Sequence, residues 1–399
     1  MTVLATAGHV DHGKSTFVNF LTNQETDRLA EEKNRGLTIN LGYTYFEYKK
    51  RVISIVDVPG HQDYFKNTIA GFSNVNGVLF CIDSVQGWSR QSEEHFKSIV
   101  SLGIRDILVI FTKTDLLEET LKKDSIIKKF SNVKDLNFQI TEFSSKTSNK
   151  ESFHQVINSF FKETDAHEEG TIWVDRTFSI DGIGTVVTGT ASKSLDLGNL
   201  YLSNYKSPLE VKKIQSLGKD IDKIVSTSRI AISLKKNPSQ PLQRGDVLSN
   251  NLLDQSEYLI LETKNETLSF EAKDTTRAYI GTSNQIVKQV KCLSVEGKNY
   301  VVIQLDKPIS AVEGQNILLH NLAKNDFLGG EVILKTNNNF QIKKLLKNKE
   351  ILNKNLLLEI LTFTPKKYIN KNISYIELED KFLSSQNLNL LDKKITDNL

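Results

Sequence analysis

The chain has 399 residues, of which 39% are hydrophobic and 25% are charged, as is typical of a folded protein rather than a disordered or fibrous one. Its 51 basic and 48 acidic residues leave a net charge of +3, so charge alone indicates no nucleic-acid partner. Two cysteines are too few for a cysteine zinc site or a disulfide framework, and no apolar run of about 18 residues predicts a membrane-spanning helix.

Over residues 1–168, short apolar runs rich in β-branched residues alternate with stretches of helical spacing. The predicted strands are 2–7, 52–58, 77–83 and 107–113, and the predicted helices are 15–23, 91–103 and 153–163. Strands fed by crossover helices form a parallel sheet that is covered by helices on its faces. We therefore expect a doubly wound α/β domain over residues 1–168.

From residue 169 the pattern changes to short alternating segments that are separated by Gly and Asn turns. Evenly spaced strands without helices predict a β-barrel over 169–255, and the same pattern predicts a second barrel over 256–336. Residues 337–399 are rich in Asn, Lys and Leu, with 11 lysines and seven acidic residues. Their helical spacing predicts a short helical extension or a truncated winged-helix module, with a poorly ordered tail as the alternative. The expected fold class is thus multidomain, α/β followed by all-β.

A phosphate-binding pattern joins the first predicted strand to the first predicted helix. Residues 8–15 read GHVDHGKS and fit G-x-x-x-x-G-K-[ST]. The glycines let backbone N–H groups turn toward phosphates, Lys14 reaches the β and γ oxygens, and the Ser15 hydroxyl ligates Mg²⁺. The N-terminus of the helix adds its positive dipole end. The candidate residues of this loop are Gly8, His9, Asp11, His12, Gly13, Lys14, Ser15 and Thr16.

The second predicted strand ends in the sequence DVPGH at residues 57–61. An acidic residue at the carboxyl end of a strand can hold magnesium, so Asp57 is a metal candidate. The Gly60 N–H is placed to contact a γ-phosphate, whose loss would release the following loop. His61 then becomes the candidate that orients the attacking water, although a lone histidine is otherwise more often structural.

Two further motifs select the base. Thr112, Lys113 and Asp115 follow the fourth predicted strand as TKTD, where an Asp carboxylate accepts from the ring N–H and exocyclic amine of guanine. Adenine does not offer this pair of donors. Ser144, Ser145 and Lys146 follow the next apolar segment and match a backbone contact to the guanine carbonyl. Both motifs together predict a guanine nucleotide; the alternative is that Asp115 only caps a helix.

The segment Arg35-Gly36-Leu37-Thr38 lies between the phosphate loop and DVPGH. A threonine here can place its hydroxyl on magnesium only while the γ-phosphate is present, which would make the segment a switch. The spacing alone does not identify a switch, because the charged residues 27–36 that lead into Thr38 are equally typical of a solvent-exposed surface.

Five motifs have now been described, at residues 8–15, 35–38, 57–61, 112–115 and 144–146. Taken in chain order, they resemble the translational GTPase superfamily, in which a GTPase domain precedes two β-barrels. The segments that carry the closer resemblance are GHVDHGKS, EEKNRGLTINLGY (31–43), DVPGH, TKTD, FSIDGIGTVVTGT (178–190), SRIAISL (228–234) and RGDVL (244–248). Together they resemble the selenocysteine-specific elongation factors over about residues 1–336. The switch region and the first barrel carry the most specific matches.

The resemblance implies a GTPase that delivers selenocysteyl-tRNA to the ribosome, with GTP/GDP and Mg²⁺ as cofactors. It implies that His61 and Lys14 act in catalysis and that Ser15, Thr38 and Asp57 hold the metal. It also places an aminoacyl pocket at Asp175, Arg176 and Arg229, where guanidinium groups select a selenolate over a neutral serine hydroxyl by charge. Asp175 is expected to meet the α-amino group or to orient Arg176. The expected protein is monomeric and cytoplasmic, with no signal-like segment before the first motif.

The chain departs from the family where it stops, about 60 residues after the second predicted barrel. That length leaves no room for an array of winged-helix modules, so recognition of an mRNA hairpin is doubtful. Two alternatives stay open: a general aminoacyl-tRNA carrier like elongation factor Tu, and a shortened tRNA- or ribosome-binding derivative without turnover. The short interval from Lys14 to Thr38 argues against the first, and the intact guanine and magnesium motifs argue against the second.

Overall fold

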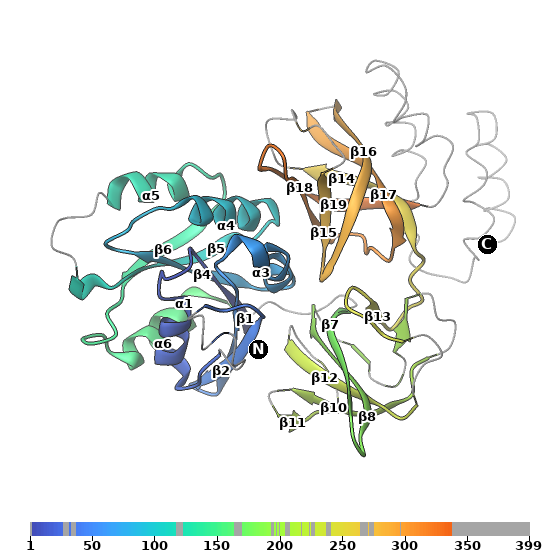
Figure 1. The fold of residues 1–399 in the computed structure, drawn as a ribbon, viewed down its shortest axis with the longest axis horizontal. Coiled ribbons are helices and arrows are strands. Elements are labelled where there is room, and N and C mark those ends of the chain that lie inside the picture. The colour runs from blue at the N-terminus through green and yellow to red at the C-terminus, as the bar shows by residue number, and fades with distance from the viewer. Residues whose placement is uncertain are drawn as a thin grey trace, which may run out of the picture.

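A computed structural model of the chain contains three units, one with helices and two built from strands (Figure 1). The structure describes residues 2–26, 32, 37–116, 123–162, 170–192, 195–196, 198, 200–203, 208–216, 218–222, 224, 228–236, 241–263, 270, 275–295 and 297–336. The expected helical extension over 337–399 lies outside these residues, as do Arg35 and Gly36. Within the described part of the chain, no helix is long and apolar enough to cross a membrane.

The N-terminal unit is a six-stranded sheet in the order β2-β3-β1-β4-β5-β6, with β2 antiparallel to β3 and the other pairs parallel. Its strands are β1 (Thr2–Ala7), β2 (Gly42–Tyr48), β3 (Arg51–Asp57), β4 (Gly77–Asp83), β5 (Asp106–Thr112) and β6 (Asn137–Glu142). Its helices are α1 (Lys14–Thr22), α3 (Phe65–Phe72), α4 (Arg90–Ser101), α5 (Lys123–Ser131) and α6 (Lys150–Phe160), with short 3₁₀ turns η1 (Gln62–Tyr64) and η2 (Thr114–Leu116).

Helices cover both faces of this sheet, which confirms the doubly wound α/β prediction. Helices α3, α4 and α5 contribute to the core on one face, and α1 and α6 contribute to the core on the other. The inner strands β1 and β4 are buried at every position, which is why they are continuous apolar runs in the sequence. The edge strands β2 and β6 are only partly buried, and β2, in which polar and apolar residues alternate, is absent from the predicted strands; β6 is the apolar segment that precedes Ser144.

The middle unit is a seven-stranded sheet in the order β11-β10-β12-β8-β7-β13-β9. Its strands are β7 (Thr171–Ile180), β8 (Gly184–Ala191), β9 (Tyr201–Leu202), β10 (Val211–Ser216), β11 (Lys219–Asp220), β12 (Ser228–Leu234) and β13 (Val247–Ser249). The third unit is a closed barrel of β14 (Ser256–Thr263), β15 (Thr276–Ile280), β16 (Ser283–Val295), β17 (Lys298–Ile309), β18 (Asn316–Asn321) and β19 (Asp326–Thr336). The all-β prediction is confirmed; within the described residues, closure is complete only for the third unit.

The three units pack against one another through their cores. Trp173 of β7 is buried in the core of the barrel, and a Cβ on Gly281 would overlap its indole ring. Phe327 of the barrel belongs to the same apolar cluster as α3 and α4. A Cβ on Gly329 of β19 would overlap the carbonyl oxygen of Ser101 at the end of α4. These close approaches place the barrel against both the N-terminal unit and the middle unit.

Candidate functional site

The loop between β1 and α1 has a backbone that only glycine supports at two positions. Gly8 has a φ of 126°, and a Cβ there would overlap the carbonyl oxygen of Cys81 in β4. Gly13 has a φ of 77° and precedes the first residue of α1. The Nζ of Lys14 donates to the carbonyl oxygens of Gly8 at 3.2 Å and His9 at 2.7 Å, so its ammonium group lies within the loop. Such a loop, at the N-terminus of a helix, binds phosphate.

Two buried histidines support this loop, His95 from α4 and His12 within the loop itself. The Nδ1 of His95 on α4 accepts from the Gly8 N–H at 3.1 Å, and burial lowers the pKa of His95 to about 3, which keeps the ring a neutral acceptor. His12 is fully buried, and burial together with the charges of His9 and Lys14 lowers its pKa to about 4. The predicted nucleotide contact of His12 is therefore limited to its backbone. Its carbonyl oxygen accepts from the Thr112 hydroxyl at 2.9 Å, which ties the loop to β5.

The predicted metal residues all present oxygen donors, and two of them, Ser15 and Thr38, lie side by side. The Ser15 Oγ and Thr38 Oγ1 lie 3.1 Å apart. Asp57 is fully buried, and its two carboxylate oxygens accept from the hydroxyls of Thr6 at 2.8 Å and Thr26 at 2.7 Å. Hydroxyl and carboxylate oxygens are the ligands that a hard cation such as Mg²⁺ prefers. Thr26 was missed by the sequence analysis because nothing local in the sequence relates it to Asp57.

The segment after β3 lies directly against the phosphate loop. A Cβ on Gly60 would overlap Lys14 Nζ and come within 2.6 Å of the Val10 nitrogen, so only glycine allows this approach. His61 is the N-cap of the turn η1, where its Nδ1 accepts from the Asp63 N–H at 3.3 Å. The His61 side chain is 40% exposed. The structure thus brings Gly60 to the loop and leaves His61 in contact with solvent.

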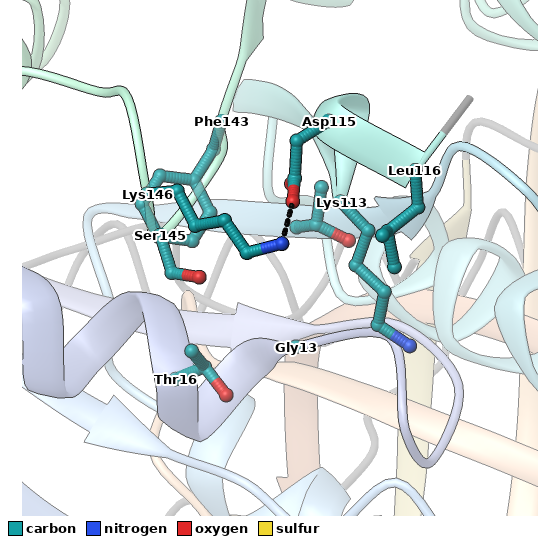
Figure 2. A pocket seen from close by; sticks show the side chains of 9 residues that line it. Gly13, Thr16, Lys113, Asp115, Leu116, Phe143, Ser145 and Lys146 are labelled. Carbon is teal, nitrogen blue, oxygen red and sulfur yellow. Dashed lines mark ion pairs between the residues drawn. The ribbon is translucent and has the colours of Figure 1, made fainter.

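A cavity of about 230 Å³ follows the phosphate loop at the carboxyl end of the sheet (Figure 2). Its lining residues are Gly13, Thr16, Thr112, Lys113, Asp115, Leu116, Phe143, Ser145 and Lys146. Asp115 and Lys146 face one another at 3.0 Å, and Thr16 of α1 lies across the cavity from them (Figure 2). The two motifs that the sequence analysis assigned to guanine therefore meet in one place.

Ion pairs keep the polar groups of this cavity charged. Hydrogen bonds from the side chains of Lys146 and Ser144 lower the pKa of Asp115, so its carboxylate is available as an acceptor. Lys113 Nζ pairs with Asp83 at 2.7 Å. Burial alone would raise the pKa of Asp83, but the hydrogen bond from Lys113 and those from two backbone N–H groups outweigh it and lower the pKa. Asp83 ends β4 within an apolar run, and no local motif predicts its pairing with Lys113.

A second cavity, of about 270 Å³, lies in the middle unit and includes Arg176 and Arg229 in its lining. The two terminal nitrogens of the Arg229 guanidinium, Nη1 and Nη2, donate to the carboxylate of Asp175, with Nη2 2.8 Å from Oδ1. Arg176 instead donates from Nη2 to the carbonyl oxygen of Leu41 at 2.8 Å. In the structure the Asp175 carboxylate is thus paired with Arg229 and not with Arg176, while its expected contact with the α-amino group of the cargo stays a prediction.

Tyr43 also lines this second cavity, although it belongs to β2 of the N-terminal unit. Its hydroxyl donates to Asp175 Oδ2 at 3.2 Å, and the Arg229 guanidinium carbon lies 3.8 Å from the centre of its ring. The sequence analysis quoted this tyrosine within the LGY segment but assigned it no role. Only the packing of β2 against the middle unit reveals its contact with the pocket.

Comparison with known proteins agrees with this geometry. Residues 1–200 match the family model described as the elongation factor Tu GTP binding domain. A selenocysteine-specific elongation factor of Haemophilus influenzae is 28% identical over 351 residues, which are 84% of this chain and 55% of that protein. One from Desulfomicrobium baculatum is 34% identical over 260 residues, 62% of this chain and 41% of that protein. The chain spans about half the length of these curated relatives.

Among solved structures, a bacterial selenocysteine-specific elongation factor, EF-Sec, superimposes with a TM-score of 0.77 at 26% sequence identity. The match covers 96% of this chain and 66% of that one. The similarity therefore extends over all three units that the structure describes.

Proposed function

The chain belongs to the family that carries the elongation factor Tu GTP binding domain, and from this premise we propose that it is a translational GTPase that binds selenocysteyl-tRNA and delivers it to the ribosome. The observation that carries the choice of cargo is the second cavity, where two arginines from different strands line one space. We place the protein in the cytoplasm with the ribosome and expect it to act as a monomer. Its curated relatives are named for the same amino acid.

The first cavity and the phosphate loop support binding of GTP. The Asp115 carboxylate accepts from the guanine N–H groups, Lys113 covers a face of the base, and Ser145 and Lys146 close the far wall. Lys14 meets the phosphate oxygens from within its loop. The two charge-assisted hydrogen bonds from guanine to Asp115, at about 1.5–3 kcal/mol each, favour the guanine nucleotide over its adenine counterpart, which lacks this pair of donors.

The oxygen donors of Ser15, Thr38 and Asp57 fit Mg²⁺. When bound, this ion neutralises charge that develops on the phosphates during hydrolysis. Thr38 and Gly60 are the residues of this chain that would sense the γ-phosphate, since both approach the phosphate loop from outside it. His61 orients the attacking water once the ribosome has moved it inward from its exposed position. The test measures GTP hydrolysis with and without ribosomes. We expect ribosomes to stimulate hydrolysis by the unaltered protein, and His61→Ala to lose this stimulation.

The cargo proposal depends on charge. A selenol is ionised at neutral pH and a serine hydroxyl is not, so a net positive pocket favours selenocysteine. Because Asp175 already neutralises Arg229, Arg176 carries the net positive charge of the pocket. Its hydrogen bond to a selenolate, at about 1.5–3 kcal/mol, corresponds to a preference of about 10- to 100-fold.

The test compares the affinities of selenocysteyl-tRNA and seryl-tRNA for the protein bound to a non-hydrolysable GTP analogue. We expect the selenocysteyl form to bind more tightly and Arg176→Ala to remove most of the preference. Arg90→Ala is the matched control, because Arg90 is an exposed arginine of α4 with a side chain that is 73% accessible. Equal binding of both tRNAs by the unaltered protein would refute the cargo proposal and favour a general aminoacyl-tRNA carrier.

A further inference from the structure

Asp83 is a buried carboxylate to which the proposed function assigns no role. It ends β4, its side chain is only 2% exposed, and it is not among the residues that line the first cavity. Its Oδ1 accepts from the backbone N–H groups of Val85 at 2.7 Å and Gln86 at 3.1 Å. Its Oδ2 pairs with the ammonium group of Lys113 at 2.7 Å. Because two backbone groups hold the carboxylate in place, it is a fixed anchor for the lysine.

Lys113 is the residue on which this anchor acts, and it lines the first cavity. Its ammonium group points away from Asp115 and Lys146 (Figure 2). The backbone of Lys113 has a φ of 55°, which is uncommon for a residue with a side chain, and such strain is concentrated at functional sites. The methylene groups of a lysine can pack on an apolar surface while its charge is held elsewhere. Lys113 therefore directs its charge to Asp83 and leaves its aliphatic stem for a ligand in the cavity.

The turn that follows Asp83 is bonded to the strand that leads to Lys113. The Ser84 N–H donates to the Thr112 carbonyl oxygen at 2.9 Å, and the Thr112 hydroxyl donates to the His12 carbonyl oxygen in the phosphate loop at 2.9 Å. The anchor is thus fixed relative to both the lysine and the phosphate loop. A lysine side chain is among those that lose the most rotamer freedom when they become ordered. An anchor that already orders it lowers the entropic cost of binding a ligand against its stem.

We propose that Asp83 is a positioning residue for the guanine base, because it holds the ammonium group of Lys113 so that the stem of the lysine covers one face of the ring. This inference rests on the proposed function. Asp83 acts only through Lys113 and touches no atom of the nucleotide, whereas Asp115 accepts from the edge of the base. Loss of the anchor therefore weakens the contact with the face of the base and leaves recognition of its edge intact.

The test uses Asp83→Asn, which keeps an acceptor for the two backbone N–H groups and removes the charge that holds Lys113. Dissociation constants are measured for GDP and for inosine diphosphate, which has the same ring system and ring N–H but lacks the exocyclic amine that donates to Asp115. We expect Asp83→Asn to raise both constants about tenfold, as for the loss of one charge-assisted hydrogen bond. The ratio of the two constants is expected to stay unchanged, because the edge contact is retained.

Two further variants separate this role from a general effect of losing an ion pair. Glu93→Gln is the matched control, because Glu93 pairs with Lys129 at 2.9 Å in the same unit and neither residue lines the cavity. We expect it to leave both dissociation constants unchanged. Lys113→Met keeps an aliphatic stem without the charge. In that background Asp83→Asn is expected to have no further effect, because no ammonium group remains for Asp83 to hold.

Nuclear magnetic resonance of protein that is isotopically labelled at the ε carbon of lysine supplies a second readout. The signal of Lys113 is assigned by its absence in Lys113→Met. The ring current of bound guanine is expected to shift this signal in the unaltered protein and in Glu93→Gln, and Asp83→Asn is expected to lose most of the shift.

The outcomes separate this inference from the proposed function. If Asp83→Asn leaves the dissociation constants and the Lys113 shift unchanged, the inference is overturned and the proposed function stands. A rise in the constants that also changes their ratio overturns the inference as well, since Asp83 would then act on the edge contact of Asp115. Failure of the unaltered protein to bind GDP would overturn the proposed function together with the inference.

Discussion

The ion pair between Asp175 and Arg229 is expected to hold the middle unit together, and removing one partner tests this directly. The side chains are only 5% and 13% exposed, so Asp175→Ala leaves a guanidinium that is largely shielded from water without its counter-charge. The hydroxyls of Tyr43 and Thr188 lose their acceptor at the same time. The change therefore affects the whole network, not a single contact.

The magnitude follows from the burial of the pair. Two opposite charges about 4 Å apart attract by about 4 kcal/mol at an effective dielectric constant of about 20. Leaving one member of a buried pair unpaired typically costs about 3–5 kcal/mol. We expect Asp175→Ala and Arg229→Ala each to lower the free energy of unfolding by about 3–5 kcal/mol. Asp175→Leu combined with Arg229→Met is expected to recover most of the loss, since no buried charge is left unpaired.

The assay is urea unfolding followed by tryptophan fluorescence. The chain has two tryptophans, so a Trp88→Phe background leaves Trp173, which lies in β7 close to Asp175, as the reporter. Lys213→Ala is the control, because Lys213 pairs with Asp220 in the same sheet but both side chains are about half exposed or more. Such surface pairs contribute about 0–1 kcal/mol. A loss of less than about 1 kcal/mol for Asp175→Ala, equal to the control, would refute the reasoning.

Two further predictions concern the loop and the packing of the units. Burial lowers the pKa of His95 to about 3, below the value of about 6.5 for an exposed histidine, so on acidification the unfolded chain takes up the proton first. Stability is then complete above about pH 6.5 and falls by up to about 1.4 kcal/mol per pH unit below it, down to about pH 3. Urea unfolding between pH 5 and 7 is expected to show a smaller slope for His95→Gln, and an unchanged slope would contradict this assignment. Gly329→Ala forces a Cβ onto the Ser101 carbonyl oxygen and is expected to cost about 1–3 kcal/mol of thermal stability by calorimetry. Gly198→Ala, whose Cβ would have ordinary contacts, is the control that is expected to change little.

The sequence by itself determined the nucleotide site because its chemistry is local. A loop of eight residues supplies the phosphate-binding backbone, and its glycines are recognisable because only glycine supports the φ of 77° to 126° found there. Parallel strands end at one edge of a sheet, which is why motifs that follow three different strands meet there. The cavity lined by Gly13, Asp115 and Lys146 is the result.

Only the tertiary structure decided which charged groups pair with one another in the cavity that is proposed to hold the aminoacyl end of the tRNA. Asp175 and Arg229 are 54 residues apart, and Tyr43 and Asp175 are 132 residues apart. The residue types predicted a charged pocket, but which carboxylate neutralises which guanidinium depends on strand register and on the packing of β2 against the middle unit. An edge strand such as β2 has no continuous apolar run by which the sequence could predict it. The residues that it packs against belong to the middle unit, and the local sequence does not specify them.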